Sequence, residues 1–396
     1  MERKLQVELG RKILSALDEH RTSLADTVYA NPVSDYISTE QAALEQQRLF
    51  GDYPLIMSLS CELPEPGDYV TNDFAGTPVL LVRGDDGKVN GFLNVCRHRG
   101  TKLCGASGKA QKTFVCPYHG WSYDRAGHLI GITDHRAFGD FDRTAHGLRR
   151  LQVSEKYGLI WVRPRLGEES IEPDLLLESL APEVAAYGLD RYTHYETRVL
   201  RRRMNWKLVV DTFLEAYHIP ILHRNTIAPI LNGRTALFQP LGRNLRMLVS
   251  RTTIDQLRGV PEESWDFLKH VAAVYVLFPN VVLVWQGDRI ETWRTYPAED
   301  GTDASVMEVS LYTREPPATE KARAYWDRNM DLLLRTVEQE DFPLAEDMQR
   351  GFHSGAQEHI TFGRNEPALA HFHKKIREAL GLNPLVARGD GRLAVS

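Results

Sequence analysis

Two short runs, each with one cysteine and one histidine, constrain this chain more than any other feature. The first is Cys-x-His at Cys96 and His98, and the second is Cys-x-x-His at Cys116 and His119, with seventeen residues between the two runs. A thiolate and an imidazole in each half form a donor set suited to transition metals. We therefore expect two loops of one sheet to hold a metal site between them.

The mixed pairs favour one kind of metal site over another. In a Rieske [2Fe–2S] cluster, two Cys hold one iron and two His hold the other. A structural zinc site is the alternative, but zinc fingers usually pair Cys with Cys and His with His. Histidine ligands make the cluster accept an electron more readily than four cysteines would. The chain is therefore expected to move single electrons.

The residues around these ligands carry a family resemblance. The stretches Cys-Arg-His-Arg-Gly at 96–100 and Cys-Pro-Tyr-His-Gly-Trp-Ser-Tyr at 116–123 closely resemble the Rieske domain of Rieske non-haem iron oxygenases. High-potential Rieske proteins of respiratory complexes have an extra Cys in each loop that forms a disulfide. Here Tyr118 takes that place in the second loop, and Cys104 lies too far along the first.

Composition limits the kinds of partner that the protein is expected to bind and the cellular compartment in which it is expected to work. The 396 residues are enough for two or three domains, and the net charge of −5 gives no reason to expect nucleic-acid or membrane binding. No apolar run approaches membrane-spanning length. Cys61 and Cys104 remain and are expected to be buried thiols, which fits a reducing cytoplasm. No Gly-x-Gly-x-x-Gly fingerprint follows a strand, so electrons must come from another protein.

Residue periodicity predicts a helical start followed by a β-rich region. Residues 1–30 are expected to be helical because Leu9, Ile13 and Leu17 recur every four residues, and a second helix is expected over 39–50. From about residue 52, turn signals separate short β-rich runs, which predicts a small antiparallel β domain. These runs cover residues 79–83, 89–94, 113–115, 121–124 and 158–162.

The second half of the chain predicts a larger domain. Three successive β runs are expected over 271–278, 281–286 and 290–296, with helices over 321–348 and 367–380. The fold class is therefore α+β. The domains expected are N-terminal helices over 1–50 that pack on the catalytic domain, a Rieske domain over 51–165 and a catalytic domain over 166–396. The family resemblance implies an antiparallel Rieske domain and a helix-grip-type catalytic domain.

A second group of metal-binding residue types lies near the middle of the chain. His218 and His223 are five residues apart, which on a straight helix would rotate their side chains about 140° from one another. Pro220 can end or kink the helix between them, so that His223 turns back toward His218. Glu215 would lie on the same helical face as His218. Without context, two such histidines are more often structural than ligands.

The family resemblance extends to this segment and supplies the third ligand. It resembles the motif in which two His and one carboxylate bind a mononuclear Fe(II) and leave positions open for O₂. Asp341 is the expected carboxylate, because the family often shows Glu-Asp followed by Gln-x-Gly, as at Gln349 and Gly351 here. The alternatives are a solvated acidic helix face, or one of three neighbouring ligands: Glu340, Glu346 and Asp347.

Two carboxylates beside the histidine pair are assigned roles by the same resemblance. Many relatives carry Asp three residues before the first iron histidine, where it bridges to a cluster histidine of a neighbouring subunit. This chain has Glu215 there, as in carnitine- and betaine-type monooxygenases. The alternative is that Glu215 only orients His218. Asp211, one turn earlier, is expected to support the metal-binding helix.

The resemblance covers nearly the whole chain and implies an activity. It implies a terminal oxygenase, cytoplasmic and homotrimeric, in which a separate reductase or ferredoxin passes NAD(P)H electrons to the cluster and an Fe(II) site hydroxylates or demethylates a small organic substrate. A cis-dihydroxylating aromatic dioxygenase is one alternative, and a Rieske electron carrier without oxygenase activity is another. A ligand-binding module with a relic cluster is a third. Tyr275, Phe278 and Trp285 are candidate pocket residues.

Overall fold

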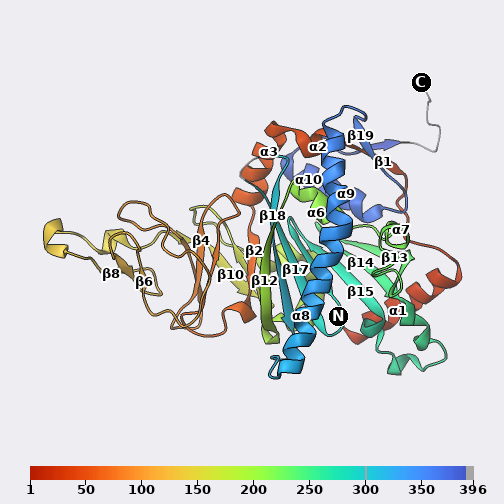
Figure 1. Ribbon diagram of the computed structural model, residues 1–396, viewed down its shortest axis with the longest axis horizontal. Coiled ribbons are helices and arrows are strands. Elements are labelled where there is room, and N and C mark those ends of the chain that lie inside the picture. Colours follow the sequence, from red (N-terminus) through yellow and green to blue (C-terminus); the bar gives the residue numbers. More distant parts are fainter. Residues whose placement is uncertain (299–300, 389–396) are drawn as a thin grey trace. The chain divides into compact units, whose positions relative to one another are not determined.

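The computed structural model describes residues 1–298 and 301–388, and the chain divides into two compact units (Figure 1). The first, here called the β unit, comprises residues 46–175 and 188–192. The second, here called the mixed unit, comprises residues 1–45, 176–187 and 193–396. Two short helices, α4 (Pro173–Leu177) and α5 (Ala181–Tyr187), follow the long β segment of the first unit.

The β unit is built from three antiparallel sheets. One contains β2 (Leu55–Leu59), β10 (Val153–Lys156) and β11 (Leu159–Val162). A second contains β3 (Tyr69–Asn72), β4 (Val79–Arg83), β5 (Val89–Leu93) and β9 (Arg150–Leu151). The third contains β6 (Phe114–Val115), β7 (Ser122–Tyr123) and β8 (Leu129–Gly131). The antiparallel arrangement expected from the sequence is confirmed.

The core of the β unit lies beside the two Cys/His runs. Phe92, Phe114, Trp121 and Tyr123 are buried in one cluster together with both cysteines of the runs. Burying such aromatic side chains removes a large apolar area from water and fixes the strands that carry them. Strands β6 and β7 are each two residues long, shorter than the runs at 113–115 and 121–124, because residues 113, 121 and 124 lie outside the paired strands.

The mixed unit contains a seven-stranded antiparallel sheet in the order β12-β18-β17-β16-β15-β14-β13 (Figure 1). Its strands are β12 (Thr193–Arg202), β13 (Leu231–Leu241), β14 (Asn244–Arg251), β15 (Val271–Leu277), β16 (Val281–Trp285), β17 (Arg289–Pro297) and β18 (Ser305–Thr313). A small sheet joins β1 (Val28–Pro32) to β19 (His359–Phe362) and β20 (Val386–Arg388). The α+β class is confirmed.

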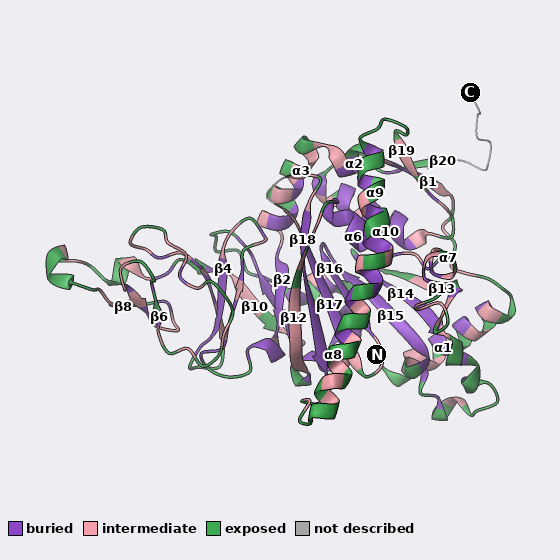
Figure 2. Cartoon of the chain, in the orientation of Figure 1, coloured by how far each residue is buried: buried purple, intermediate pink, exposed green. Residues whose placement is uncertain are grey.

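The central strands of this sheet are covered on both faces. Every residue of β15, β16 and β18 is buried, as the purple strands in Figure 2 illustrate. A strand that is buried on both faces reads as a continuous apolar run rather than as an alternating one. This explains why the runs at 271–278 and 281–286 are recognisable as strands β15 and β16. Strand β17, in the run at 290–296, contains polar and charged residues as well.

Helices cover the sheet and complete the mixed unit. They are α1 (Arg3–Asp18), α2 (Ser34–Ile37), α3 (Thr39–Glu45), α6 (Trp206–Asp211), α7 (Ile219–Leu222), α8 (Glu320–Thr336), α9 (Phe342–Phe352) and α10 (Pro367–Leu380). Helix α8 packs on the sheet, where Arg198 of β12 donates to Asp331 of α8 at 2.9 Å. The helix expected over 367–380 is α10.

Two predicted helices differ from the structure. The helix expected over 1–30 ends at Asp18, and strand β1 takes residues 28–32, where Pro32 biases Asn31 toward an extended backbone. The helix expected over 321–348 is α8 and α9 joined by a π-helical turn, Val337–Asp341. A second π turn, Gln46–Asp52, follows α3. Within the described residues, no helix is both long and apolar enough to cross a membrane.

Candidate metal sites

The two Cys/His runs of the β unit form loops of the same design. They belong to two sheets rather than to the one expected, because the first follows β5 and the second joins β6 to β7. In the first, the Cys96 N–H donates to Thr101 and the Gly100 N–H returns to the Cys96 carbonyl at 3.0 Å. In the second, the Cys116 N–H donates to Trp121 and the Gly120 N–H returns to the Cys116 carbonyl at 3.0 Å. Gly100 and Gly120 have φ of 82° and 70°, a left-handed conformation that glycine adopts at little cost.

These loops bring the four candidate ligands together. Cys96 and Cys116 are buried, and the rings of His98 and His119 lie 4.7 Å apart. The Nδ1 atom of His98 is buried without a hydrogen-bond partner in the described part of the chain, as expected of an atom that binds a metal. Two thiols and two imidazoles therefore fit the donor set of a [2Fe–2S] cluster.

Neighbouring side chains hold these ligands in place. Trp121 stacks on His98 with ring centroids 4.7 Å apart and planes at 11°. The Tyr123 hydroxyl accepts from the Arg97 N–H at 3.0 Å and lies 3.4 Å from the Cys96 sulfur. Burial raises the pKa of the Cys96 thiol, although the hydrogen bond with Tyr123 opposes this shift. A bound cation would instead hold this cysteine as the thiolate.

The second group lies in the mixed unit, around α7. His218 and His223 flank this four-residue helix at its N- and C-terminal ends. Pro220 lies in the first turn of α7, where a missing N–H costs nothing. The prediction that Pro220 ends or kinks a helix between the histidines was therefore wrong. Glu215 also lies outside any helix, in the turns after α6. The rings of His218 and His223, at the two ends of this short helix, have centroids 5.0 Å apart.

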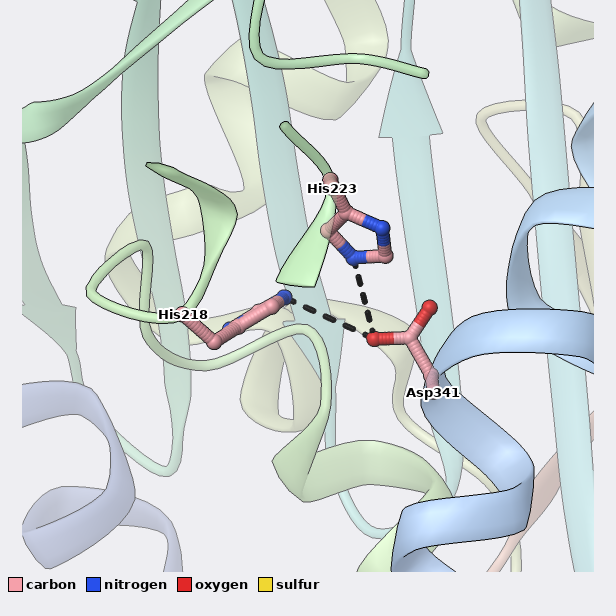
Figure 3. A group of neighbouring side chains, drawn as sticks. All are labelled: His218, His223 and Asp341. Carbon is pink, nitrogen blue, oxygen red and sulfur yellow. Dashed lines mark hydrogen bonds and ion pairs between the residues drawn. The ribbon is translucent and has the colours of Figure 1, made fainter. Parts of the chain in front are cut away.

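His218, His223 and Asp341 converge on one point, as Figure 3 shows. Nε2 of His223 lies 3.1 Å from Oδ1 of Asp341, and Nε2 of His218 lies 3.5 Å from the same oxygen. All three ligand atoms lie within 4.8 Å of one another. Two imidazoles and one carboxylate on one side of an ion could bind it and leave other positions open.

Two further carboxylates bind the opposite nitrogens of the same rings. Nδ1 of His218 bonds Glu215, which also accepts the His218 backbone N–H at 3.0 Å. Nδ1 of His223 bonds Glu340, which accepts the Thr226 hydroxyl at 2.8 Å. An Nδ1–H that donates to a carboxylate leaves Nε2 as the free lone pair, and such partners orient metal-binding histidines. Each imidazole is therefore fixed with Nε2 toward Asp341.

The local electrostatics favour charged partners around His223. Burial alone would lower the pKa of His223, but the hydrogen bonds and charges of Asp341 and Glu340 raise it. Burial alone would raise the pKa of Glu340, but its bonds from His223 and Thr226 lower it. The surroundings of His223 thus stabilise a positive charge on this side of the site. A divalent cation is a stronger source of that charge than a proton.

The alternative third ligands lie elsewhere. Glu340 bonds His223 Nδ1, on the ring edge away from Asp341. Glu346 accepts the Arg203 backbone N–H at 3.1 Å, and Asp347 pairs with exposed Arg350. Asp341 itself is buried, in contrast to an acidic helix face in solvent.

Asp211 is placed behind the histidines rather than among them. It ends α6, and its carboxylate accepts the Tyr36 hydroxyl at 2.7 Å and approaches Nε2 of His373 at 2.9 Å. The same tyrosine and histidine lie 3.0 Å apart, which closes a buried polar triangle. These bonds tie the end of α6 to α2 and α10. Asp211 therefore lies at the end of α6, well before His218, and its supporting role stays a prediction.

A cavity of about 200 Å³ opens beside the three converging residues. Its sheet wall consists of Met247, Val249, Ala272, Val274 and Val284. The candidate pocket residues Tyr275, Phe278 and Trp285 do not line it. Side chains alternate between faces along a strand, so Val274 and its cross-strand partner Val284 face the cavity.

On the opposite face of the sheet, the Tyr275 hydroxyl donates to Glu183. In strands buried on both faces, composition alone does not reveal which set of residues faces the site. Tyr275 and Trp285 therefore lie on the other face from the cavity, and Phe278 lies beyond the end of β15, so the prediction that these three residues line the pocket was wrong.

Sequence reasoning missed the polar residues at one end of this cavity, which are Arg251, Gln286, Arg289 and Glu291. The available signal was a charged residue within otherwise apolar strands. Glu291, for example, is 1% exposed in β17. A buried charge needs a partner or a function, and this could have marked the position.

Comparison with known proteins identifies the class. The Rieske [2Fe-2S] domain family matches residues 54–146, and the ring hydroxylating alpha subunit (catalytic domain) family matches residues 189–382. The carnitine monooxygenase oxygenase subunit of Escherichia coli is 32% identical over 364 residues, which cover 86% of this chain and 91% of that protein. The chain belongs to the Rieske non-haem iron oxygenases, whose α subunits carry a Rieske [2Fe–2S] cluster and a mononuclear iron.

One relative that matches part of this chain and two solved structures with the same fold agree with this class. The glycine betaine monooxygenase oxygenase subunit of Chromohalobacter salexigens is 37% identical over 177 residues, 44% of this chain and 39% of that protein. This chain therefore spans less than half the length of that relative. The fold matches the quaternary ammonium Rieske monooxygenase CntA in complex with L-carnitine, with a TM-score of 0.74, 20% identity, and 89% and 96% of the two chains covered. The fold also matches naphthalene 1,2-dioxygenase from Rhodococcus, with a TM-score of 0.71 and 18% identity. That match covers 94% of this chain and 98% of the dioxygenase chain.

Proposed function

We propose that this chain is the terminal oxygenase of a multi-component system that hydroxylates or demethylates a small organic substrate. The observation that carries this proposal is the cavity of about 200 Å³ directly beside His218, His223 and Asp341. An electron carrier needs no such cavity, whereas an enzyme must bind its substrate next to the reacting centre. The second donor set, in the β unit, gives the same chain a site for one-electron chemistry.

The residues of the chain have distinct roles in this proposal. Cys96, His98, Cys116 and His119 would hold the cluster, and His218, His223 and Asp341 would hold the iron. When bound, these groups supply single electrons and O₂ activation. Glu215 and Glu340 hold the two imidazoles with Nε2 toward the iron position. The apolar sheet wall orients the substrate and excludes water. Asp211 anchors the end of α6.

The assembly proposed is a homotrimer in which each cluster serves the iron of the next chain. Tyr217 and Ile221 are 64% and 71% exposed beside Glu215, and Tyr118 is 56% exposed beside His119. Large exposed apolar side chains beside a site indicate a contact surface. We expect Glu215 and His119 to meet across this contact, which repeats head to tail and closes into a ring.

The supply of electrons and the compartment are also part of the proposal. A separate reductase or ferredoxin would transfer electrons from NAD(P)H, and the protein would work in the cytoplasm. Residues 51–165 are proposed as the cluster domain, and residues 166–396 as the catalytic domain, on which residues 1–50 pack.

Iron analysis separates the proposal from its main alternative. The oxygenase requires three irons per chain, whereas a Rieske electron carrier requires two. We expect three irons, a Rieske EPR signal after reduction, and O₂ uptake with a reductase and substrate. Two irons without O₂ uptake would establish the carrier. A cis-diol product would instead establish the dioxygenase alternative.

Mixed oligomers test the route of the electrons. A Cys116→Ser chain lacks a cluster ligand, and a His218→Ala chain lacks an iron ligand, so each alone should be inactive. When the two are co-expressed, some contacts pair an intact cluster with an intact iron site, and part of the activity should return. Inactive hybrids beside active wild-type trimers would refute electron transfer between chains.

A further inference from the structure

The apolar sheet wall of the cavity beside the candidate iron site ends at a positively charged side chain, Arg251. Met247, Val249 and Arg251 alternate along β14, so all three face the cavity. Arg251 is the last residue of the strand. On β15 and β16 the neighbouring residues of the sheet wall are Val274 and Val284. A molecule lying on this sheet wall would contact apolar side chains along its length and the Arg251 guanidinium at one end.

The acids near Arg251 are already paired with another arginine. Arg289 donates to Glu291 at 2.9 Å and to Asp288 at 3.2 Å. The second oxygen of Asp288 accepts the Tyr325 hydroxyl at 3.1 Å. Asp288 and Glu291 thus both bond Arg289. The second cation at this end of the cavity is Arg251.

Arg251 therefore lacks a carboxylate of its own. Its guanidinium donates to the side chain and backbone oxygens of Gln286, at 2.7 and 3.3 Å. Within residues 1–298 and 301–388, Arg251 forms no ion pair. Burial and, next, the charge of Arg289 lower the pKa of Arg251, and the charges of Asp288 and Glu291 oppose this shift only in part. An anion placed against Arg251 would relieve both effects.

We propose that the substrate is a small organic acid with an apolar body, whose carboxylate pairs with Arg251 and whose apolar part reaches His218, His223 and Asp341. This inference rests on the proposed oxygenase function and names its substrate class. Guanidinium and carboxylate match as a planar two-point pair, which would fix the end of the substrate that reacts. The acid would be bound at one end and oxidised at the other.

The cavity does not suit a quaternary ammonium group. Such groups are recognised by cages of aromatic rings, which attract the cation through their faces. Among the described residues that line this cavity, Phe213 is the single aromatic side chain besides the two histidines. A positive group would also face Arg251 and Arg289. The related carnitine and glycine betaine monooxygenases are named for compounds that carry both a carboxylate and a quaternary ammonium group. This chain is inferred to differ from them at the end of the substrate away from the carboxylate.

Calorimetric binding measurements with matched ligands test the proposal. The probes are benzoate against benzamide, hexanoate against hexanamide, and tetramethylammonium, each added to the iron-loaded protein. At least one acid should bind more tightly than its amide, by about tenfold to a hundredfold, because a hydrogen-bonded charge contributes about 1.5–3 kcal/mol. Arg251→Gln should remove this preference, and Arg251→Lys should retain part of it, since lysine keeps the charge but loses the planar fork.

Controls separate specific recognition from a general charge effect. Arg258 is an exposed arginine that pairs with Asp18 and Asp255 and does not line the cavity, so Arg258→Gln should bind the acids as the wild type does. A carboxylate could also bind the iron directly, and Arg251→Gln would then keep the preference for the acid. The comparison of acid and amide on the wild-type protein stands even if Arg251→Gln folds poorly.

Three results would overturn the inference: acids that bind no better than their amides, an unchanged preference in Arg251→Gln, or tighter binding of tetramethylammonium than of either acid. Failure of the oxygenase function is seen differently, as two irons per chain or as no O₂ uptake. Binding preference is measured without turnover, so the two failures are distinguishable.

Discussion

Replacing Glu340 with glutamine tests whether this residue supports the iron site without binding the metal. Glu340 bonds Nδ1 of His223, while Asp341 approaches Nε2 of the same ring. A glutamine oxygen can still accept from Nδ1, so the ring should stay in place. The negative charge would be lost, and His223 would become a weaker donor to a metal at Nε2.

The size of the effect follows from this geometry. Loss of a hydrogen-bonded carboxylate behind a metal-binding histidine typically weakens metal affinity by about 10–100-fold. That range corresponds to about 1.4–2.7 kcal/mol. Glu340 also accepts from Thr226, which will continue to hold an amide oxygen in position. We therefore expect about tenfold weaker Fe(II) binding for Glu340→Gln and a larger loss for Glu340→Ala.

The assay is anaerobic Fe(II) titration of protein from which the mononuclear iron has been removed, with the visible absorption of the cluster as an internal reference. Glu346→Gln is the matched control, because Glu346 is six residues further along and bonds the Arg203 backbone. Iron affinity should be unchanged in this control. Wild-type affinity in both Glu340 variants, or a loss in Glu346→Gln, would refute the assignment of Glu340 as the partner of His223.

Three other predictions concern the partner contact, the core and pH. Glu215→Gln should reduce turnover per bound iron, because Glu215 is proposed to meet the neighbouring chain as well as His218; unchanged turnover per iron would remove it from the electron path. Glu45→Ala should lower the free energy of unfolding by about 3–5 kcal/mol, because it leaves the buried ammonium of Lys207 without its partner. Urea denaturation should show that adding Lys207→Met recovers most of this loss. Burial lowers the pKa of His371 to about 4, from an ordinary 6.5. As the pH falls, the unfolded chain therefore binds this proton at a higher pH than the folded protein does. The contribution of His371 to the free energy of unfolding is complete above pH 6.5 and falls by about 1.4 kcal/mol per pH unit down to pH 4. In His371→Gln, the pH dependence of urea denaturation should be shallower by that slope.

The sequence predicted the local parts of both sites and missed the parts that depend on the third dimension. The ligand loops of the β unit are continuous segments, so their residues could be read directly from Cys96 to Gly120. His218 and His223 were also identified as a pair, although Pro220 lies in the first turn of the helix between them and does not break it. What each residue binds remains a prediction.

The third ligand shows why sequence alone leaves alternatives. Glu340 and Asp341 are adjacent and chemically alike, yet they approach opposite nitrogens of one imidazole. Which acid reaches which nitrogen depends on the backbone turn around them. In the same way, the apolar strands that carry Tyr275 and Val274 gave no sign of which face meets the cavity. Burial on both faces removes the polar alternation that would have decided it.

The π-helical turn at Val337–Asp341 makes the iron site's tolerance of chain length depend on position. A π turn is equivalent to one extra residue within an α-helix, and its wider turn accommodates that residue, so α8 and α9 keep nearly the same rotational phase on either side. Deletion of Gln339 would therefore let the two helices fuse into one regular helix while Asp341 stays on the face that meets His218 and His223. A deletion in the regular part of α8 would instead rotate every residue on one side by about 100° relative to the other side. Iron analysis should show the mononuclear iron kept after deletion of Gln339, and lost, with the cluster retained, after a deletion within regular α8.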